Sequence, residues 1–461
     1  MADVMSRRRF LAWTGAASVA AAAAGWSIEA LAARARIDPL TPGTGVLVML
    51  TMYGGNDGLN TVIPAGDGVY QSARPELAYA ESEVLPLGDG LGLNPGMPGL
   101  KLLWDDDRLA IVRGLSYPKP DHSHFRSMDI WQTASPDRPV SSGWLGRWLD
   151  GHGHDPLLAV SLDPVLPPML AGETVAGAAL PASGLTLPGG DLGRAFAALG
   201  GTDPGQSGPA AVAARAVADL HRTSATIGPM LTGTGTGTAS GTGTAPGTGT
   251  GTASGIGTAS GTDPDAGSST EPDTGSGADP DGDRPARSTP VKLGRGGKGG
   301  GGGTPLAQQL ATVAECVEMG APTRAYSVSL GGFDTHTGER ATQQRLLTEV
   351  DGAVSAFLNR MAGSARGRGV VLVAYSEFGR RVAANANQGT DHGTAGPVLV
   401  AGHSVRGGFV GEQPSLTDLD NGDLKASGDF RDVYATMLAD VLDTDPERIL
   451  GPGRKVLPLV A

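Results

Sequence analysis

The sequence predicts an α/β protein with a mostly parallel central sheet and helices on both faces. Two observations support this fold class. Short, continuous apolar runs recur along the chain, as expected for strands that are buried on both faces of a sheet. Helix-like segments separate these runs, and strands that alternate with helices are typical of α/β folds. The apolar runs lie at 46–52, 109–112, 326–330, 370–375 and 397–401.

The helix-like segments fall between the predicted strands, in the order that an alternating sheet requires. They lie at 98–104, 125–133, 209–221, 306–319, 342–361 and 430–442. Ligands of such sheets bind beyond the carboxyl ends of the strands. The polar clusters that directly follow the apolar runs are therefore the first candidates for a functional site.

Residues 1–35 predict a twin-arginine signal peptide. Residues 6–11 are Ser-Arg-Arg-Arg-Phe-Leu, an apolar run of small residues extends to Trp26, and Ala-x-Ala cleavage motifs follow at 30–32 and 33–35. This order of charge, apolar run and small residues is typical of an export signal. The run is too short and too rich in Ala and Gly for a membrane anchor. With no other stretch apolar enough for a membrane helix, we expect a soluble mature chain in the periplasm, in the cell envelope or outside the cell.

The remaining chain, 45–461, is predicted to be one domain with a long insertion at 232–303. The insertion runs from Gly-Thr repeats through an Asp- and Pro-rich stretch into poly-Gly, and it accounts for much of the total of 73 glycines. Without aromatic anchors such a tract cannot offset its ordering entropy, so we expect it to be disordered. It could be a surface insertion or a spacer to the cell envelope.

Charge and cysteine content narrow the function classes. The formal net charge of -12 argues against a nucleic-acid partner, because polyanions require a basic surface. It is compatible with a cation site, which acidic side chains favour. The single cysteine, Cys316, makes an internal disulfide impossible and is expected to be a packed thiol.

Polar clusters follow three of the predicted strands. Asp57 lies in the glycine-rich segment 54–60, where it could bind a cation or form an Asx-type turn with its own backbone. Asp334 and His336 lie in the segment 331–338 and offer one oxygen and one nitrogen ligand, or form an ordinary polar loop.

Two further segments complete this set of candidates. Glu377 and Arg380 follow 370–375, and they suit a cation and an anionic group or a solvated ion pair. His392 follows Asp391 shortly before 397–401, in what could also be a surface turn. Together the clusters suggest a carboxylate and imidazole site for Zn, Mn or Fe. Such a metal would polarise an ester oxygen and lower the pKa of water or a hydroxyl.

Ser123 lies at the start of the helix-like segment 125–133, within Asp-His-Ser-His-Phe-Arg-Ser. Its hydroxyl could cap the helix. It could instead be a nucleophile at the positive end of the helix, activated by a metal or a histidine.

These motifs resemble one exported bacterial family, the domain of unknown function 1501. The resemblance rests on the twin-arginine leader, on 54–60 and on Ser-His-Phe at 123–125. It rests also on Phe-Asp-Thr-His at 333–336, Ser-Glu-Phe-Gly-Arg at 376–380 and Gly-Thr-Asp-His-Gly at 389–393. It covers the chain after about residue 45, except for the insertion. That family is similar to the alkaline phosphatase and sulfatase superfamily.

The resemblance implies roles for the individual residues. Ser123 would be the nucleophile and Arg380 would stabilise the transferred group. Asp57 and Glu377 would hold one divalent metal. The other metal would be held by the three candidate ligands Asp334, His336 and His392.

The sequence departs from the superfamily pattern in two places. Asp334 precedes His336 by two residues where four are usual, and Phe378 stands where the second site would have an imidazole. One metal site is thus complete, whereas the second lacks a ligand. Two hypotheses follow: a metal-dependent hydrolase of small or glycan-linked phosphate or sulfate esters, or a binding or envelope-assembly protein that lost catalysis.

Overall fold

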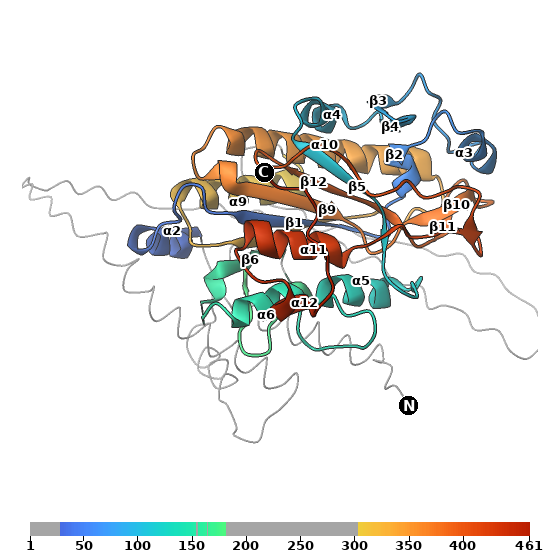
Figure 1. Cartoon of the computed structure of the whole chain (residues 1–461). Coiled ribbons are helices and arrows are strands. Elements are labelled where there is room, and N and C mark those ends of the chain that lie inside the picture. The colour runs from blue at the N-terminus through green and yellow to red at the C-terminus, as the bar shows by residue number, and fades with distance from the viewer. Residues whose placement is uncertain (1–27, 154, 164, 181–302) are drawn as a thin grey trace, which may run out of the picture. The chain divides into compact units, whose positions relative to one another are not determined.

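A nine-stranded mixed sheet organises residues 28–153, 155–163, 165–180 and 303–461, which are the residues that this computed structural model describes (Figure 1). In spatial order its strands are β13 (Gly408–Val410), β5 (Leu109–Ser116), β12 (Gly396–Gly402), β9 (Val370–Tyr375), β1 (Val46–Tyr53), β8 (Ala325–Gly331), β6 (Ala159–Ser161) and β7 (Ala178–Ala179), and β16 (Gly428–Asp429) also pairs with β5. All five predicted strands are present.

Most neighbouring strands are parallel, as predicted. The central strand β1 runs parallel to β8 and to β9, and Leu47 is in register with Ala325 on one side and Val371 on the other. The exception is β12, which runs antiparallel to both β9 and β5. The sheet is therefore mixed, and the α/β class is confirmed in this form.

Both faces of β1 are buried because its side chains alternate between two apolar cores. Val46, Val48 and Leu50 belong to the core formed with α4 (Pro98–Asp105), α9 (Pro305–Met319) and α10 (Glu339–Ala362). Leu47 and Met49 belong to the core formed with α5 (His124–Thr133), α6 (Trp144–Asp150) and α11 (Arg431–Thr436). Figure 1 shows these two helix layers on opposite sides of the sheet, which confirms the predicted layering.

The ends of the helices follow from local chemistry. In α9 the Thr304 hydroxyl accepts a hydrogen bond from the Ala307 N–H, and Gly320 ends the helix with a φ of 83°. The predicted helix at 430–442 is divided into α11 and a π-helical turn, Met437–Val441. The predicted helix at 209–221 lies outside the described residues.

Smaller elements surround the sheet. A ribbon of β10 (Arg380–Ala384) and β11 (Thr390–His392) places Arg380 opposite His392. The other short strands and helices are β2 (Val62–Ile63), β3 (Leu85–Gly88), β4 (Leu91–Leu93), β14 (Leu419–Asp420), β15 (Asp423–Leu424), α3 (Gly68–Ala73), α12 (Glu447–Leu450) and the 3-10 turns Gly58–Asn60, Pro156–Leu158, Pro168–Leu170 and Gly367–Gly369.

The described residues include only the end of the predicted signal peptide. Both candidate cleavage motifs lie in or at the start of α2 (Ile28–Ile37), where Leu31 is fully buried in the core with α9. Residues 1–27 and, apart from Gly303, the predicted insertion at 232–303 lie outside the described part of the chain. No helix in the described part is long and apolar enough to cross a membrane.

Candidate metal centre

The carboxyl ends of three adjacent strands bring the predicted clusters together. The loops that follow β1, β8 and β9 begin at Gly54, Gly332 and Ser376. Because β1 runs parallel to both of its neighbours, these loops lie at the same edge of the sheet. Gly54 has a φ of +121°, and a Cβ there would lie 2.3 Å from the backbone nitrogen of Asp334. Only glycine allows the first and second loops to approach so closely.

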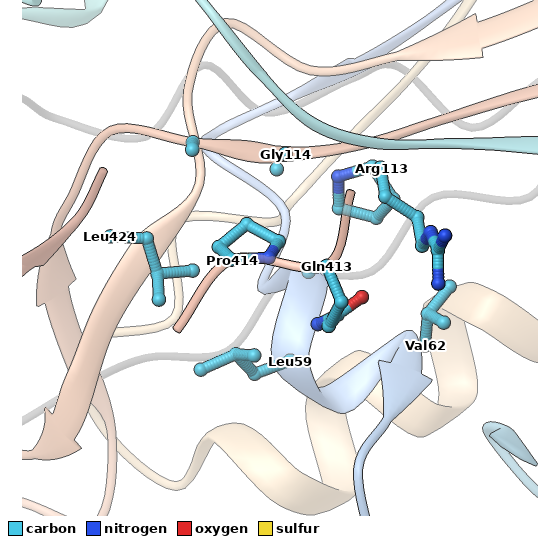
Figure 2. Close-up of a pocket in the computed structure, with 11 residues that line it drawn as sticks. Leu59, Val62, Arg113, Gly114, Gln413, Pro414 and Leu424 are labelled. Carbon is cyan, nitrogen blue, oxygen red and sulfur yellow. The ribbon is translucent and has the colours of Figure 1, made fainter. Parts of the chain in front are cut away.

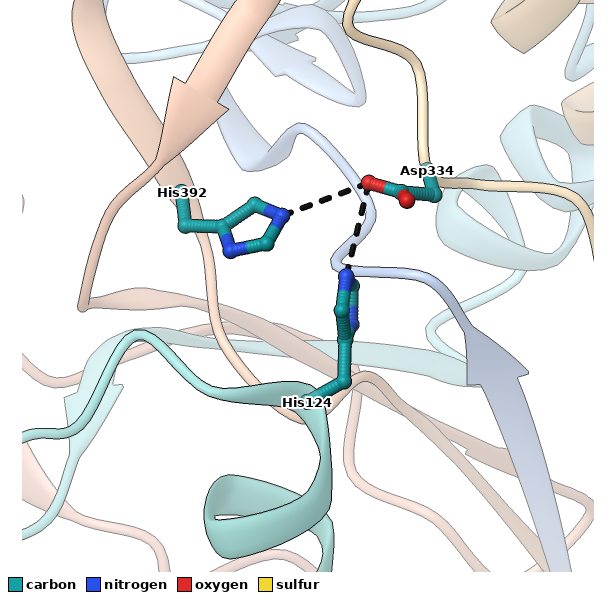
Figure 3. Close-up of side chains that lie close together, drawn as sticks. All are labelled: His124, Asp334 and His392. Carbon is teal, nitrogen blue, oxygen red and sulfur yellow. Dashed lines mark hydrogen bonds and ion pairs between the residues drawn. The ribbon is translucent and has the colours of Figure 1, made fainter. Parts of the chain in front are cut away.

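Three imidazoles converge on one carboxylate oxygen of Asp334. The Nε2 atoms of His336, His392 and His124 lie 3.1, 3.3 and 3.4 Å from Asp334 Oδ1. The Nε2 atoms of His336 and His392 are 2.9 Å apart. Figure 3 shows His124 and His392 pointing at Asp334 from two directions. All four side chains remain partly open to solvent, with 21–49 % of their surface exposed.

The Nδ1 atom of each imidazole faces an oxygen outside the cluster. His124 Nδ1 lies 2.9 Å from Glu377 Oε1, and His392 Nδ1 lies 2.7 Å from the carbonyl oxygen of His122. His336 Nδ1 lies 3.6 Å from Asp391 Oδ1. Because a carbonyl and a carboxylate only accept hydrogen bonds, the neutral rings of His124 and His392 carry their proton on Nδ1. Their Nε2 lone pairs therefore point into the cluster.

Lone pairs aimed at a carboxylate require a proton or a cation between them. The carboxylates of Asp334 and then Glu377 raise the pKa of His124 to about 9. His124, then His392, and also Arg380 lower the pKa of Asp334. Burial and the nearby Arg380 guanidinium lower the pKa of His336, which keeps this ring neutral and able to bind a metal. Metal and proton would compete for the Nε2 lone pair of His124.

The donor set fits a divalent metal of the Zn, Mn or Fe class. Three imidazole nitrogens and one carboxylate oxygen suit these ions. Ligand atoms around a tetrahedral zinc ion lie about 3.3 Å apart, given bond lengths of about 2.0–2.1 Å. Four of the six separations within this set are 2.9–3.4 Å, close to that value. The ligand atoms of His124, Asp334 and His392 all lie within 4.8 Å of one another.

Glu377 lies behind His124 rather than among the converging donor atoms. Its carboxylate is 2 % exposed and accepts hydrogen bonds from the Gly54 N–H at 2.8 Å and the Ser376 hydroxyl at 2.9 Å, as well as contacting His124. Burial raises the pKa of Glu377, but these hydrogen bonds, above all that of His124, outweigh burial and lower it. An ionised carboxylate in this position orients a metal-binding imidazole.

Arg380 supports Asp334 from the interior. Its side chain is fully buried and lies 2.9 Å from Asp334 Oδ1. The same guanidinium donates to the carbonyl oxygens of Gly54, Gly55, Phe333 and Thr390. All three of its nitrogens donate to protein groups. Arg380 and Glu377 are both buried, so the alternative prediction of a solvated ion pair between them is wrong.

Asp57 is not among the side chains whose ligand atoms group together. Its carboxylate is fully buried, pairs with Arg74, and accepts a hydrogen bond from the Leu59 N–H at 3.1 Å. The Leu59 bond is the Asx-type turn that the alternative interpretation predicts. The cation beside Asp57 in this structure is a guanidinium, which differs from the predicted metal.

Ser123 occupies the N-cap position of α5, as predicted, but its side chain makes no capping hydrogen bond. The residue is exposed, and its backbone N–H donates to Asp121 Oδ1 at 2.8 Å. Ser127, the other hydroxyl of this segment, is buried and donates to the carbonyl oxygen of Asp121. The stabilising role expected of a Ser123 cap is therefore wrong, while its role as a nucleophile stays a prediction.

Sequence reasoning missed two residues of this region, His124 and Arg74. His124 was part of the Ser-His-Phe motif, and its position as the first residue of a helix after a polar loop is the signal that could have identified it. Phe378 packs its ring 4.9 Å from that of His124 and 4.7 Å from that of His392. It forms an apolar wall of the cluster.

A separate hollow lies beside the Gly58–Asn60 turn (Figure 2). Its lining is mostly apolar, with Leu59, Val62 and Leu424 among the residues. Arg113, at its edge, directs its guanidinium to the carbonyl oxygen of Gly411. The hollow contains none of the predicted metal ligands.

Part of the chain matches a known protein family. Residues 297–455 match the model of the family described as Protein of unknown function (DUF1501). This match supports the predicted relationship to the domain of unknown function 1501. It covers Asp334, His336, Glu377, Arg380 and His392, whereas His124 precedes the matched segment. No curated protein and no solved structure matches the chain significantly.

We predict that Glu377→Gln weakens Zn²⁺ binding by about 10- to 100-fold, as expected when an outer partner of a metal-binding histidine is lost. The uncharged amide can still occupy the space, so the fold should persist. NMR titration of the metal-free protein should show the pKa of His124 falling below its value of about 9. The exposed Glu412→Gln is the matched control, and equal affinities for the two variants would contradict this role of Glu377.

Proposed function

We propose that the protein is a metal-dependent hydrolase that acts on small or glycan-linked phosphate or sulfate esters. The observation that carries this proposal is the convergence of three imidazole Nε2 atoms on Asp334 Oδ1, with separations of 3.1–3.4 Å. In this proposal the four side chains hold one divalent ion, Zn or Mn being the best suited. The partial exposure of these side chains leaves a side open for a substrate.

A bound ion of this class polarises an ester oxygen and lowers the pKa of water or a hydroxyl. The residues of this chain supply the remaining functions. Glu377 orients the imidazole of His124, and Arg380 holds Asp334 in place. The ring of Phe378, which contacts those of His124 and His392, would exclude water from that side of the site. The exposed hydroxyl of Ser123, adjacent to His124 in the sequence, is the candidate nucleophile.

The proposal also includes an alkaline-phosphatase-like sheet and export from the cytoplasm. An alkaline-phosphatase-like arrangement of the sheet is supported by candidate ligands at the carboxyl ends of parallel strands. Export by the twin-arginine route, to the periplasm, the envelope or the exterior, is supported by the Arg-Arg motif and the small-residue run that follows it. The net charge of -12 supports the absence of a nucleic-acid partner.

One observation favours the second hypothesis, a binding or envelope-assembly protein without catalytic activity. The three nitrogens of Arg380 donate to backbone carbonyls and to Asp334, so this residue is not free to stabilise the oxygens of a transferred group. In that case the metal would serve to bind a ligand rather than to hydrolyse it.

The experiment that separates the two hypotheses measures turnover of p-nitrophenyl phosphate and p-nitrophenyl sulfate by the full chain, after chelation and after reloading with Zn²⁺ or Mn²⁺. We expect activity that depends on the metal and that disappears in Asp334→Asn and Ser123→Ala. Circular dichroism should show that both variants retain the fold. Ser404→Ala, which changes another serine, serves as the control for a lost hydroxyl.

A reloaded protein that binds metal but hydrolyses neither ester would favour the binding hypothesis. Activity that is unchanged in Asp334→Asn would contradict the proposed centre. If only Ser123→Ala retains activity, the metal site stands, and Ser123 is excluded as its nucleophile.

A further inference from the structure

The surroundings of Asp57 bear on how many metal ions the proposed centre holds. This question rests on the function proposed above, in which Asp57 was one ligand of a second ion. Both the Asp57 carboxylate and the Arg74 guanidinium are fully buried, and they pair directly. A buried carboxylate needs one positive partner to offset its desolvation, and Asp57 already has one.

Arg74 is held in this position by further hydrogen bonds. Its Nε atom donates to the carbonyl oxygen of Val382 at 2.7 Å, and one terminal nitrogen donates to that of Arg381 at 2.5 Å. Together with the bond to Asp57, every nitrogen of the guanidinium has an acceptor. Arg74 thus attaches Asp57 to the β10 strand and cannot move aside for an ion without leaving these carbonyls unpaired.

A second carboxyl group, Glu339, adds to the local balance of charge. It is buried at the start of α10, and its Oε2 atom accepts a hydrogen bond from the Thr390 hydroxyl at 2.5 Å. Burial, and then the negative charge of Asp57, raise the pKa of Glu339. Burial also acts to raise the pKa of Asp57, but the charge of Arg74 and the hydrogen bonds from Glu339, Arg74 and Leu59 together lower it. One ionised carboxylate therefore faces one guanidinium, and no net negative charge remains to attract a metal.

The other expected ligand of the second ion is also engaged. Glu377 accepts hydrogen bonds from Gly54, Ser376 and His124, which occupy both of its oxygens. By contrast, the buried Nε2 atom of His124 has no hydrogen-bond partner and lies 3.4 Å from Asp334 Oδ1. Two buried oxygens on the Asp57 side, Glu339 Oε1 and Gln343 Oε1, also have no hydrogen-bond partner. There, however, the guanidinium of Arg74 already supplies the positive charge that faces Asp57.

We infer that the centre is mononuclear: the chain holds one metal ion at Asp334, His336, His392 and His124, and the guanidinium of Arg74 takes the place of a second ion beside Asp57. Chemistry at such a centre uses one ion and the neighbouring protein groups. It does not use a pair of ions that hold the attacking and leaving oxygens together.

The test is the number of Zn²⁺ ions retained by the full-length protein. The protein is stripped with a chelator, saturated with Zn²⁺, passed through a desalting column and analysed by atomic emission. We expect about one ion per chain in the wild type. Asp57→Asn should retain the same amount, with a Kd within about threefold of the wild-type value, as for independent sites. Asp334→Asn, the matched carboxylate change, should retain none.

Two ions per chain in the wild type, falling to one in Asp57→Asn, would overturn the mononuclear inference while the proposed metal-dependent function stands. No retained ion in the wild type would overturn both. If Asp57→Asn does not fold, the wild-type stoichiometry decides the question by itself. A Co²⁺ titration followed by visible absorption measures the number of ions independently. For a mononuclear centre the absorption should stop rising at one equivalent of Co²⁺ per chain.

Discussion

Replacing His392 with alanine should weaken Zn²⁺ binding by more than about 100-fold. Loss of an outer partner of a metal ligand weakens binding by at most about that factor, and His392 is a proposed ligand itself. His392 offers its Nε2 atom to the cluster at 2.9 Å from His336 and 3.3 Å from Asp334, and alanine removes that donor. The remaining donors cannot complete a four-ligand site. The affinity is measured by competition with a chromophoric chelator at constant pH.

The fold should tolerate this substitution. The His392 side chain is 21 % exposed, and its loss removes a ring contact with Phe378 and one hydrogen bond to the carbonyl of His122. We expect a cost of about 1 kcal/mol in the free energy of unfolding, the usual value for one hydrogen bond. His403→Ala, at an exposed position, is the control. Equal Zn²⁺ affinity in the two variants would exclude His392 as a ligand.

Replacing Arg380 with methionine should cost about 3 kcal/mol or more in the free energy of unfolding, because several carbonyl groups lose their donor at about 1–3 kcal/mol each. The fully buried guanidinium bonds to four carbonyl groups, from two loops and from β11, and to Asp334. Methionine fills much of the volume but leaves those carbonyls without a donor. Urea unfolding followed by circular dichroism measures the loss.

The neighbouring residue supplies a matched control. Arg381 lies next to Arg380 on β10 and contacts Asp423, but its side chain is 40 % exposed. Arg381→Met should therefore cost less than about 1 kcal/mol, as for a surface ion pair. If Arg380→Met instead kept the stability of the wild type and lost only turnover, the role in transition-state stabilisation implied by the family resemblance would be restored.

The sheet and its site-bearing loops were predictable because their signal is local. A run such as 370–375 is apolar throughout, which indicates a strand buried on both faces, and the polar residues after it must then lie at the sheet edge. The same reasoning identified Asp334, His336 and His392 as candidates. The direction of β12 was not predictable, because an apolar run does not record whether its neighbour is parallel or antiparallel.

The partners of the charged residues could not be derived in this way. Arg74 pairs with Asp57 across a turn and a short helix and also bonds to β10, more than 300 positions later in the sequence. Nothing in the local pattern around Arg74 distinguishes it from a surface arginine. Glu377 was predicted to be a ligand, but His124 lies between it and Asp334. This arrangement depends on the directions of the side chains, which the spacing of residues in the sequence does not encode.

Because β1 lies between β8 and β9, metal binding at the proposed centre should be coupled to folding of the whole sheet. β1 and His124 come from the part of the chain before the segment 181–302, whereas β8, β9 and the other three candidate ligands come from the part after it. Neither part alone contains a four-ligand set, so an ion that binds only the assembled sheet stabilises both parts at once. At a free concentration 100 times its Kd, this linkage adds about 2.7 kcal/mol to the stability of the whole unit. Loss of metal would therefore lower the unfolding temperature of the entire sheet rather than loosen one loop.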